Sequence, residues 1–209
     1  MCGIIAIVRR PSTRETPTAE AVIALVADQA ARLVPGATDL DEALIDVGRR
    51  LTEADELLRG VPGLRLMLAD AGLGPRLVHH CGEILAAVVA EEERLERHGE
   101  LVTAEVERRN HALITIRDGV WALTRDRLRA AEVVAALSGG LRTTGALEAF
   151  LSVHQALSAI DRLEVRGRDS AGLHVLIHDH ALDLNDPVVG AEIERRSTDP
   201  NFGLTLIHI

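Results

Sequence analysis

A helical repeat of apolar residues dominates the first 145 positions and constrains the fold more than any other feature of the chain. Between Leu40 and Leu58 the apolar residues recur at steps of three and four, which predicts an amphipathic helix. Asp39 and Asp41 stand at its start, where acidic side chains suit the positive helix end. The run Gly60-Val61-Pro62-Gly63 is predicted to end this helix.

Similar patterns continue along the chain as far as Gly145. A second helix is predicted over Ile84–Leu95, with an acidic, arginine-rich stretch at 91–97 on its solvated face and an end at His98-Gly99. Further helix is expected over Leu101–Leu137, broken near Asp118-Gly119 and followed by the loop Ser138-Gly139-Gly140. The region from Thr18 to Gly145 is therefore expected to be a bundle of four to six helical segments.

The patterns on either side of this region mix strands and helices. The expected elements are a strand at Cys2–Val8, a helix at Gly145–Leu163, a strand at Leu173–His178, a turn at Asp183–Pro187, a helix at Val188–Arg196 and a strand at Gly203–Ile209. The last strand has no polar tail after it, which suggests a chain that has been cut.

Composition narrows the classes of function. The formal net charge is −9 and only 1% of the residues are aromatic, which disfavours nucleic-acid binding and base stacking. Two cysteines in 209 residues argue against a disulfide scaffold. No apolar stretch is long enough to cross a membrane and no signal peptide is evident, so a cytoplasmic protein is expected.

Cys2 is the candidate nucleophile. Removal of the initiator Met places its thiol and the free α-amine on one residue, and an amine with an ordinary pKa of about 7.7–8.0 can act as a base near neutrality. The apolar run Gly3–Val8 is expected to hold this terminus in place. Burial of Cys2 as an ordinary core residue is the alternative.

Two segments far apart in the sequence resemble one enzyme family. The opening Met1-Cys2-Gly3-Ile4-Ile5 and the segment 162–172, Arg-Leu-Glu-Val-Arg-Gly-Arg-Asp-Ser-Ala-Gly, are similar to the glutaminase domain of class II glutamine amidotransferases. The second segment points to the branch that makes glucosamine 6-phosphate from fructose 6-phosphate. Val165 and Arg168 replace two tyrosines of that family's pattern.

The resemblance implies a fold and a chemistry. The implied fold class is α+β: a partial N-terminal-nucleophile hydrolase αββα sandwich formed by residues 1–11 and 144–209. A helical subdomain, residues 12–143, is inserted into it. Cys2 would attack glutamine with its α-amine as base, while Arg166, Gly167 and Asp169 would support the site. Glutamine would be the substrate, and no cofactor is expected.

The chain lacks other parts of the family's pattern. It has no Asn-Gly dipeptide for an oxyanion hole and no His-Thr-Arg segment. A sugar phosphate would be reached only through C-terminal domains that are not in these 209 residues, so an N-terminal portion of a longer enzyme is expected. Amidophosphoribosyltransferase and asparagine synthetase relatives share the Cys2 start. The alternatives are a catalytically inactive fragment, or a non-enzymatic helical module for protein interaction or oligomerisation on an amidotransferase scaffold. A homodimer fits each of these.

The histidines do not form a metal motif in sequence. His79, His80 and Cys81 are adjacent, so their side chains cannot all converge from one helix. His174 and His178 share a face of the predicted strand, but four ligands at tetrahedral-site spacing are missing. No metal site is predicted, and Cys81 is expected to pack in the helical core.

Overall fold

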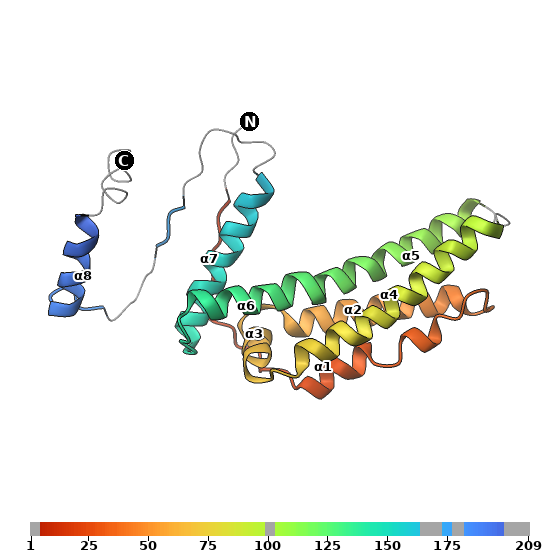
Figure 1. Cartoon of the computed structure of the whole chain (residues 1–209), viewed down its shortest axis with the longest axis horizontal. Helices are drawn as coiled ribbons and strands as arrows, with labels where there is room; N and C mark the ends of the chain where they lie inside the picture. The colour runs from red at the N-terminus through yellow and green to blue at the C-terminus, as the bar shows by residue number, and fades with distance from the viewer. Residues whose placement is uncertain (1–4, 99–102, 164–172, 177–181, 199–209) are drawn as a thin grey trace. The chain divides into compact units, whose positions relative to one another are not determined.

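The computed structural model describes residues 5–98, 103–163, 173–176 and 182–198 (Figure 1). The chain divides into two compact units, Met1–Leu173 and His174–Ile209. The α-helices of the first unit are α1 (Ala19–Val26), α2 (Leu40–Leu58), α3 (Gly60–Ala69), α4 (Leu73–His98), α5 (Thr103–Trp121), α6 (Leu128–Leu137) and α7 (Thr144–Leu163). The 3-10 turn η1 (Ala30–Arg32) follows α1, the π-helical turn η2 (Ala122–Arg127) joins α5 to α6, and the second unit contains α8 (Pro187–Ser197).

The predicted α+β sandwich is wrong for the described part of the chain, which contains helices and no β-strand. Residues 5–8 and 173–176, both predicted to lie in strands, have no regular secondary structure. The backbone of a β-strand forms hydrogen bonds with a neighbouring strand. The described part of the chain contains no strand that could pair with residues 5–8 or 173–176. The predicted strand at Gly203–Ile209 lies outside the described residues.

Helix α2 occupies the centre of the main hydrophobic core. Its predicted apolar stripe is confirmed: Leu44, Val47 and Leu51 are at most 1% exposed. The stripe packs against α1 on one side and α5 on another. Asp39 is the N-cap residue but makes no capping hydrogen bond with its side chain. Packing, rather than a strong cap, therefore stabilises this helix.

The residues predicted to end α2 also begin the next helix. Helix α2 ends at Leu58, as predicted, and Gly60 adopts a positive φ of 72°. Pro62 then lies in the first turn of α3, where its missing N–H is not needed. A Cβ on Gly63 would lie 2.1 Å from the carbonyl oxygen of Leu58, so only glycine fits this sharp turn.

The predicted break near Asp118-Gly119 does not occur. Helix α5 continues through Gly119 to Trp121 and then passes through η2 into α6. A Cβ on Gly119 would come within 2.7 Å of the Leu51 Cβ, so this glycine allows α5 to approach α2 closely. The glycine thus serves helix packing instead of ending the helix.

Helix α4 is longer than predicted and its acidic stretch is not wholly solvated. It begins at Leu73 and ends at His98, which confirms the predicted end. Glu91 is only 1% exposed, because Arg94 and Arg109 both donate hydrogen bonds to its carboxylate. A buried carboxylate is tolerated when such partners satisfy it.

A second hydrophobic cluster joins α3, α6 and α7. Leu147 and Leu151 of α7 pack with Val61, Leu64 and Val134. The helix predicted at Gly145–Leu163 is confirmed, but its apolar stripe is only partly buried, since Leu157 is 41% exposed.

The second unit contains a capped helix. The predicted turn is confirmed by the hydrogen bond from the Asp186 N–H to the Asp183 carbonyl, 3.1 Å. The predicted helix at Val188–Arg196 is confirmed as α8, in which no residue is buried. Among the described residues, no helix combines the length and apolar character needed to cross a membrane.

Candidate functional site

The predicted site residues Cys2, Arg166, Gly167 and Asp169 all lie outside the described residues. The structure does describe the chain next to both groups, residues 5–9 after Cys2 and helix α7 before Arg166. These two stretches lie side by side (Figure 1).

Arg9 joins these two stretches. Its Nε donates a hydrogen bond of 2.8 Å to the Ser152 Oγ, and its Nη2 donates a hydrogen bond to the Gln155 Oε1. Burial lowers the pKa of the Arg9 guanidinium, while the charge of Glu148 opposes this shift. The Oε1 atom of Glu148 is buried and has no hydrogen-bond partner within the described ranges. The contact is thus partly desolvated and anchors residues 5–9 along α7.

The second cysteine is not a candidate nucleophile. Cys81 lies on the core face of α4 with 1% exposure, which confirms its predicted place in the helical core. Burial raises the pKa of its thiol to about 12. A thiol that stays protonated is a poor nucleophile, so any reactive cysteine in this chain would be Cys2.

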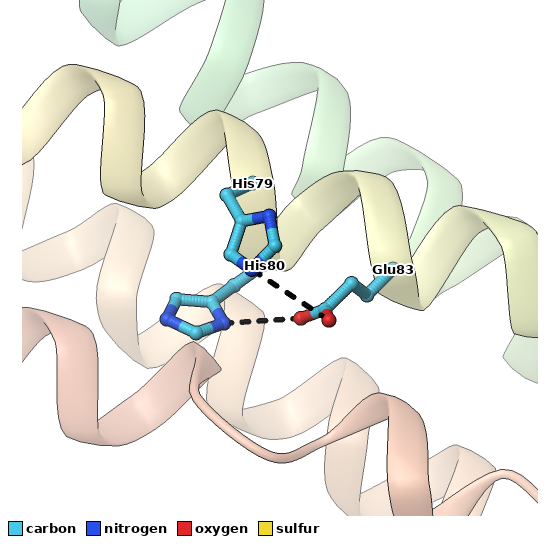
Figure 2. Close-up of side chains that lie close together, drawn as sticks. All are labelled: His79, His80 and Glu83. Atoms are coloured by element: carbon cyan, nitrogen blue, oxygen red, sulfur yellow. Dashed lines mark hydrogen bonds and ion pairs between the residues drawn. The ribbon is translucent and has the colours of Figure 1, made fainter.

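A cluster of possible metal ligands, His79, His80 and Glu83, lies on α4 beside its buried face (Figure 2). His80 Nδ1 lies 3.2 Å from Glu83 Oε2, and His79 Nε2 lies 3.6 Å from Glu83 Oε1. One ligand atom from each of the three residues lies within 4.8 Å of the other two. The side chains of His79 and Glu83 are 66% and 49% exposed, whereas that of His80 is 21% exposed.

The helix geometry explains this convergence. Each residue advances about 100° around a helix, so Glu83 falls in angle between His79 and His80, one turn further along. Side chains tilt toward the helix start, which brings the Glu83 carboxylate back over both rings. Glu83 lies outside the adjacent run His79-His80-Cys81 and was not predicted as a partner of the histidines. The steps of three and four residues to a glutamate could have indicated it.

The buried carboxylates among the described residues of the first unit, Asp55 and Glu91, are satisfied by arginine partners. Asp55, 4% exposed, accepts hydrogen bonds from Arg59 at 2.9 Å and from Arg127 at 2.7 Å. Such closed pairs stabilise packing and leave no group poised for chemistry.

Comparison with known proteins gives no relatives for this chain. No family model, no curated protein and no solved structure matches it. What the chain does must therefore be inferred from its own residues.

Proposed function

We propose that this chain is the N-terminal portion of a glutamine-dependent amidotransferase, which hydrolyses glutamine and supplies ammonia to a sugar phosphate such as fructose 6-phosphate. The proposal rests on the Cys2 opening and on the segment 162–172. It does not rest on the αββα sandwich, which the described helices contradict. The sugar phosphate would bind to domains beyond these residues.

One structural observation supports the proposal. Arg9 holds residues 5–9 against Ser152 on α7, although these residues are 143 positions apart. From Ser152 to Leu163 the helix rises about 16 Å, at about 1.5 Å per residue. The seven Cα-to-Cα steps from Arg9 back to Cys2 can span up to about 25 Å. Chain length therefore allows Cys2 to reach the end of α7, where the segment with Arg166 begins.

The proposed chemistry needs a free N-terminus. The α-amine of Cys2 accepts the thiol proton, and the thiolate attacks the side-chain carbonyl carbon of glutamine. The carbon–nitrogen bond breaks, the proton passes to the departing ammonia, and a γ-glutamyl thioester remains. Water then hydrolyses the thioester to glutamate. Arg166 would stabilise the Cys2 end of the chain electrostatically, and Gly167 and Asp169 would shape the turn beside Arg166.

Covalent labelling tests the proposal directly. The 209-residue chain is treated with a diazoketone analogue of glutamine, and its intact mass and tryptic peptides are measured. We expect loss of Met1 and one adduct on the peptide Cys2–Arg9, with labelling prevented by excess glutamine. Turnover of glutamine should be at most trace, because removal of one oxyanion-hole donor alone costs about 2.7–4 kcal/mol.

The two cysteines provide matched variants. Cys2→Ser should abolish the adduct, and Cys81→Ala should retain it because the buried Cys81 thiol is unreactive. Retention of Met1, or labelling that glutamine does not prevent, would overturn the proposal. The helical interaction module would then be the better description.

A further inference from the structure

We infer that His79, His80 and Glu83 form a binding site for one divalent transition-metal ion on the exposed surface of α4 (Figure 2). This inference is independent of the proposed glutaminase function. It is carried by the position of three ligand atoms on one helix.

The spacing of these atoms fits a metal ion. Zinc binds imidazole nitrogen at about 2.0–2.1 Å and carboxylate oxygen at about 2.0–2.2 Å, so two ligand atoms of a tetrahedral site lie about 3.4 Å apart. The two pairs here are 3.2 Å and 3.6 Å apart. Each histidine nitrogen thus lies near one edge length from a different oxygen of the Glu83 carboxylate, and rotation of the side chains would bring both nitrogens and one oxygen around a single ion.

The ligand types select the class of ion. Two imidazoles and one carboxylate suit zinc, cobalt, nickel and copper, whereas magnesium and calcium prefer sites made entirely of oxygen. Three protein ligands leave a fourth position for water or another molecule. The site therefore binds a divalent ion such as zinc or cobalt and leaves one coordination position of that ion open.

The scaffold favours binding because it is rigid before the ion arrives. Leu77, Cys81 and Ile84 fix α4 in the core at 0–1% exposure, while His79 and Glu83 are exposed to solvent and His80 is half-buried. A Cβ on Gly82, beside Glu83, would meet no atom within 4 Å, so nothing crowds the approach there. Little backbone ordering accompanies binding, which limits its entropic cost.

Titration of the full chain with Co²⁺ and Zn²⁺ tests the inference. A Cys2→Ser background is used, because the Cys2 thiol and α-amine are a competing chelate. We expect one ion per chain, visible cobalt absorption bands, and selective broadening of the His79 and His80 ring signals in NMR spectra. Magnesium should leave those signals unchanged.

Matched variants locate the site. Loss of an outer-shell partner weakens metal binding about 10–100-fold, so His79→Ala and Glu83→Gln should each weaken it at least about tenfold. His111→Ala removes an exposed helical histidine from α5 and should have no effect. Circular dichroism confirms that each variant folds. Wild-type affinity in both ligand variants, or cobalt broadening of other histidines only, would overturn the inference.

Discussion

Helices α2 and α8 are stabilised in opposite ways. Helix α2 begins at Asp39, which makes no side-chain capping hydrogen bond, yet it buries a continuous apolar stripe. Helix α8 has no buried residue, but the Asp186 carboxylate accepts hydrogen bonds from the N–H groups of Val188 and Val189, and Pro187 opens the helix. Tertiary packing thus maintains α2, whereas local interactions maintain α8.

The difference between α2 and α8 corresponds to two kinds of sequence signal for a helix. An apolar stripe predicts both a helix and the face on which it packs. A cap, an initial proline and ion pairs predict only that a helix forms. Substitutions in α2 should therefore change the stability of the first unit, and those in α8 should act locally.

The largest effect is expected from a cavity in the core. Leu51→Ala removes a side chain that is 0% exposed and packs beside Gly119 of α5. It should lower the free energy of unfolding by about 2–5 kcal/mol in urea denaturation. Ile45→Ala on the same helix removes a side chain that is 63% exposed and should change it by less than about 0.5 kcal/mol. Equal effects would contradict the assignment of α2 to the core.

A smaller loss is expected from the buried carboxylate of α2. Asp55→Ala leaves Arg127, 22% exposed, without its acceptor and should cost about 1–3 kcal/mol in the same denaturation experiment. Glu53→Ala disrupts an ion pair on the exposed side of α2 and should cost little. An unchanged free energy of unfolding in the Asp55→Ala variant would show that this buried network contributes nothing to stability.

Loss of a cap tests the local character of α8. Asp186→Ala removes the acceptor for two backbone N–H groups, and caps of this kind contribute about 1 kcal/mol. Hydrogen exchange of Val188 and Val189 should accelerate while urea unfolding of the first unit stays unchanged. Asp39→Ala, at the start of α2, lacks such a bond and should have a smaller effect on exchange there. The comparison between α2 and α8 fails if both substitutions act alike.

The smallest effect is a pH dependence in α8. Hydrogen bonds from Arg195, which has the larger effect, and from Arg196 lower the pKa of Glu192 from 4.5 to about 2. The contribution of this cluster is therefore present above about pH 4.5 and is lost as the pH falls toward 2. The Glu192 carboxyl signal in NMR spectra should titrate in that acidic range and move upward with added salt, because the pair is exposed. Titration near 4.5 would show that the cluster does not form.

Apolar residues at helical spacing predicted the helices well, and glycine and proline residues predicted two helix ends correctly, at Leu58 and His98, but wrongly predicted a break at Gly119. The apolar stripe of α2 was predicted because leucines at steps of three and four lie on one face of a helix, and that face packs against the core. Gly119 was misleading because a glycine can allow close helix packing, whereas Pro62 lies in the run that ends α2 as predicted and also in the first turn of α3. Such roles depend on neighbours that are distant in sequence.

The predicted strands show where single-chain reasoning fails. A short apolar run such as residues 4–8 does not distinguish a strand from another packed segment. The described residues 5–8 are exposed, and Arg9 directly after them donates a hydrogen bond to Ser152 of α7, 143 residues away. The roles of Cys2, Arg166, Gly167 and Asp169 stay predictions. The cluster of His79, His80 and Glu83 was accessible from the sequence, but only by reading spacings along a helix face.

The π-helical turn η2 limits how the chain can change in length. One residue inserted into or removed from an α-helix rotates everything after it by about 100°. The turn at Ala122–Arg127 accommodates an extra residue between α5, whose buried residues join the main core, and α6, whose buried residues join the second cluster. Removing one residue there would swing α6 off α3 and α7. The packing of α6 therefore depends on the number of residues between Trp121 and Leu128 as well as on the side chains in its core.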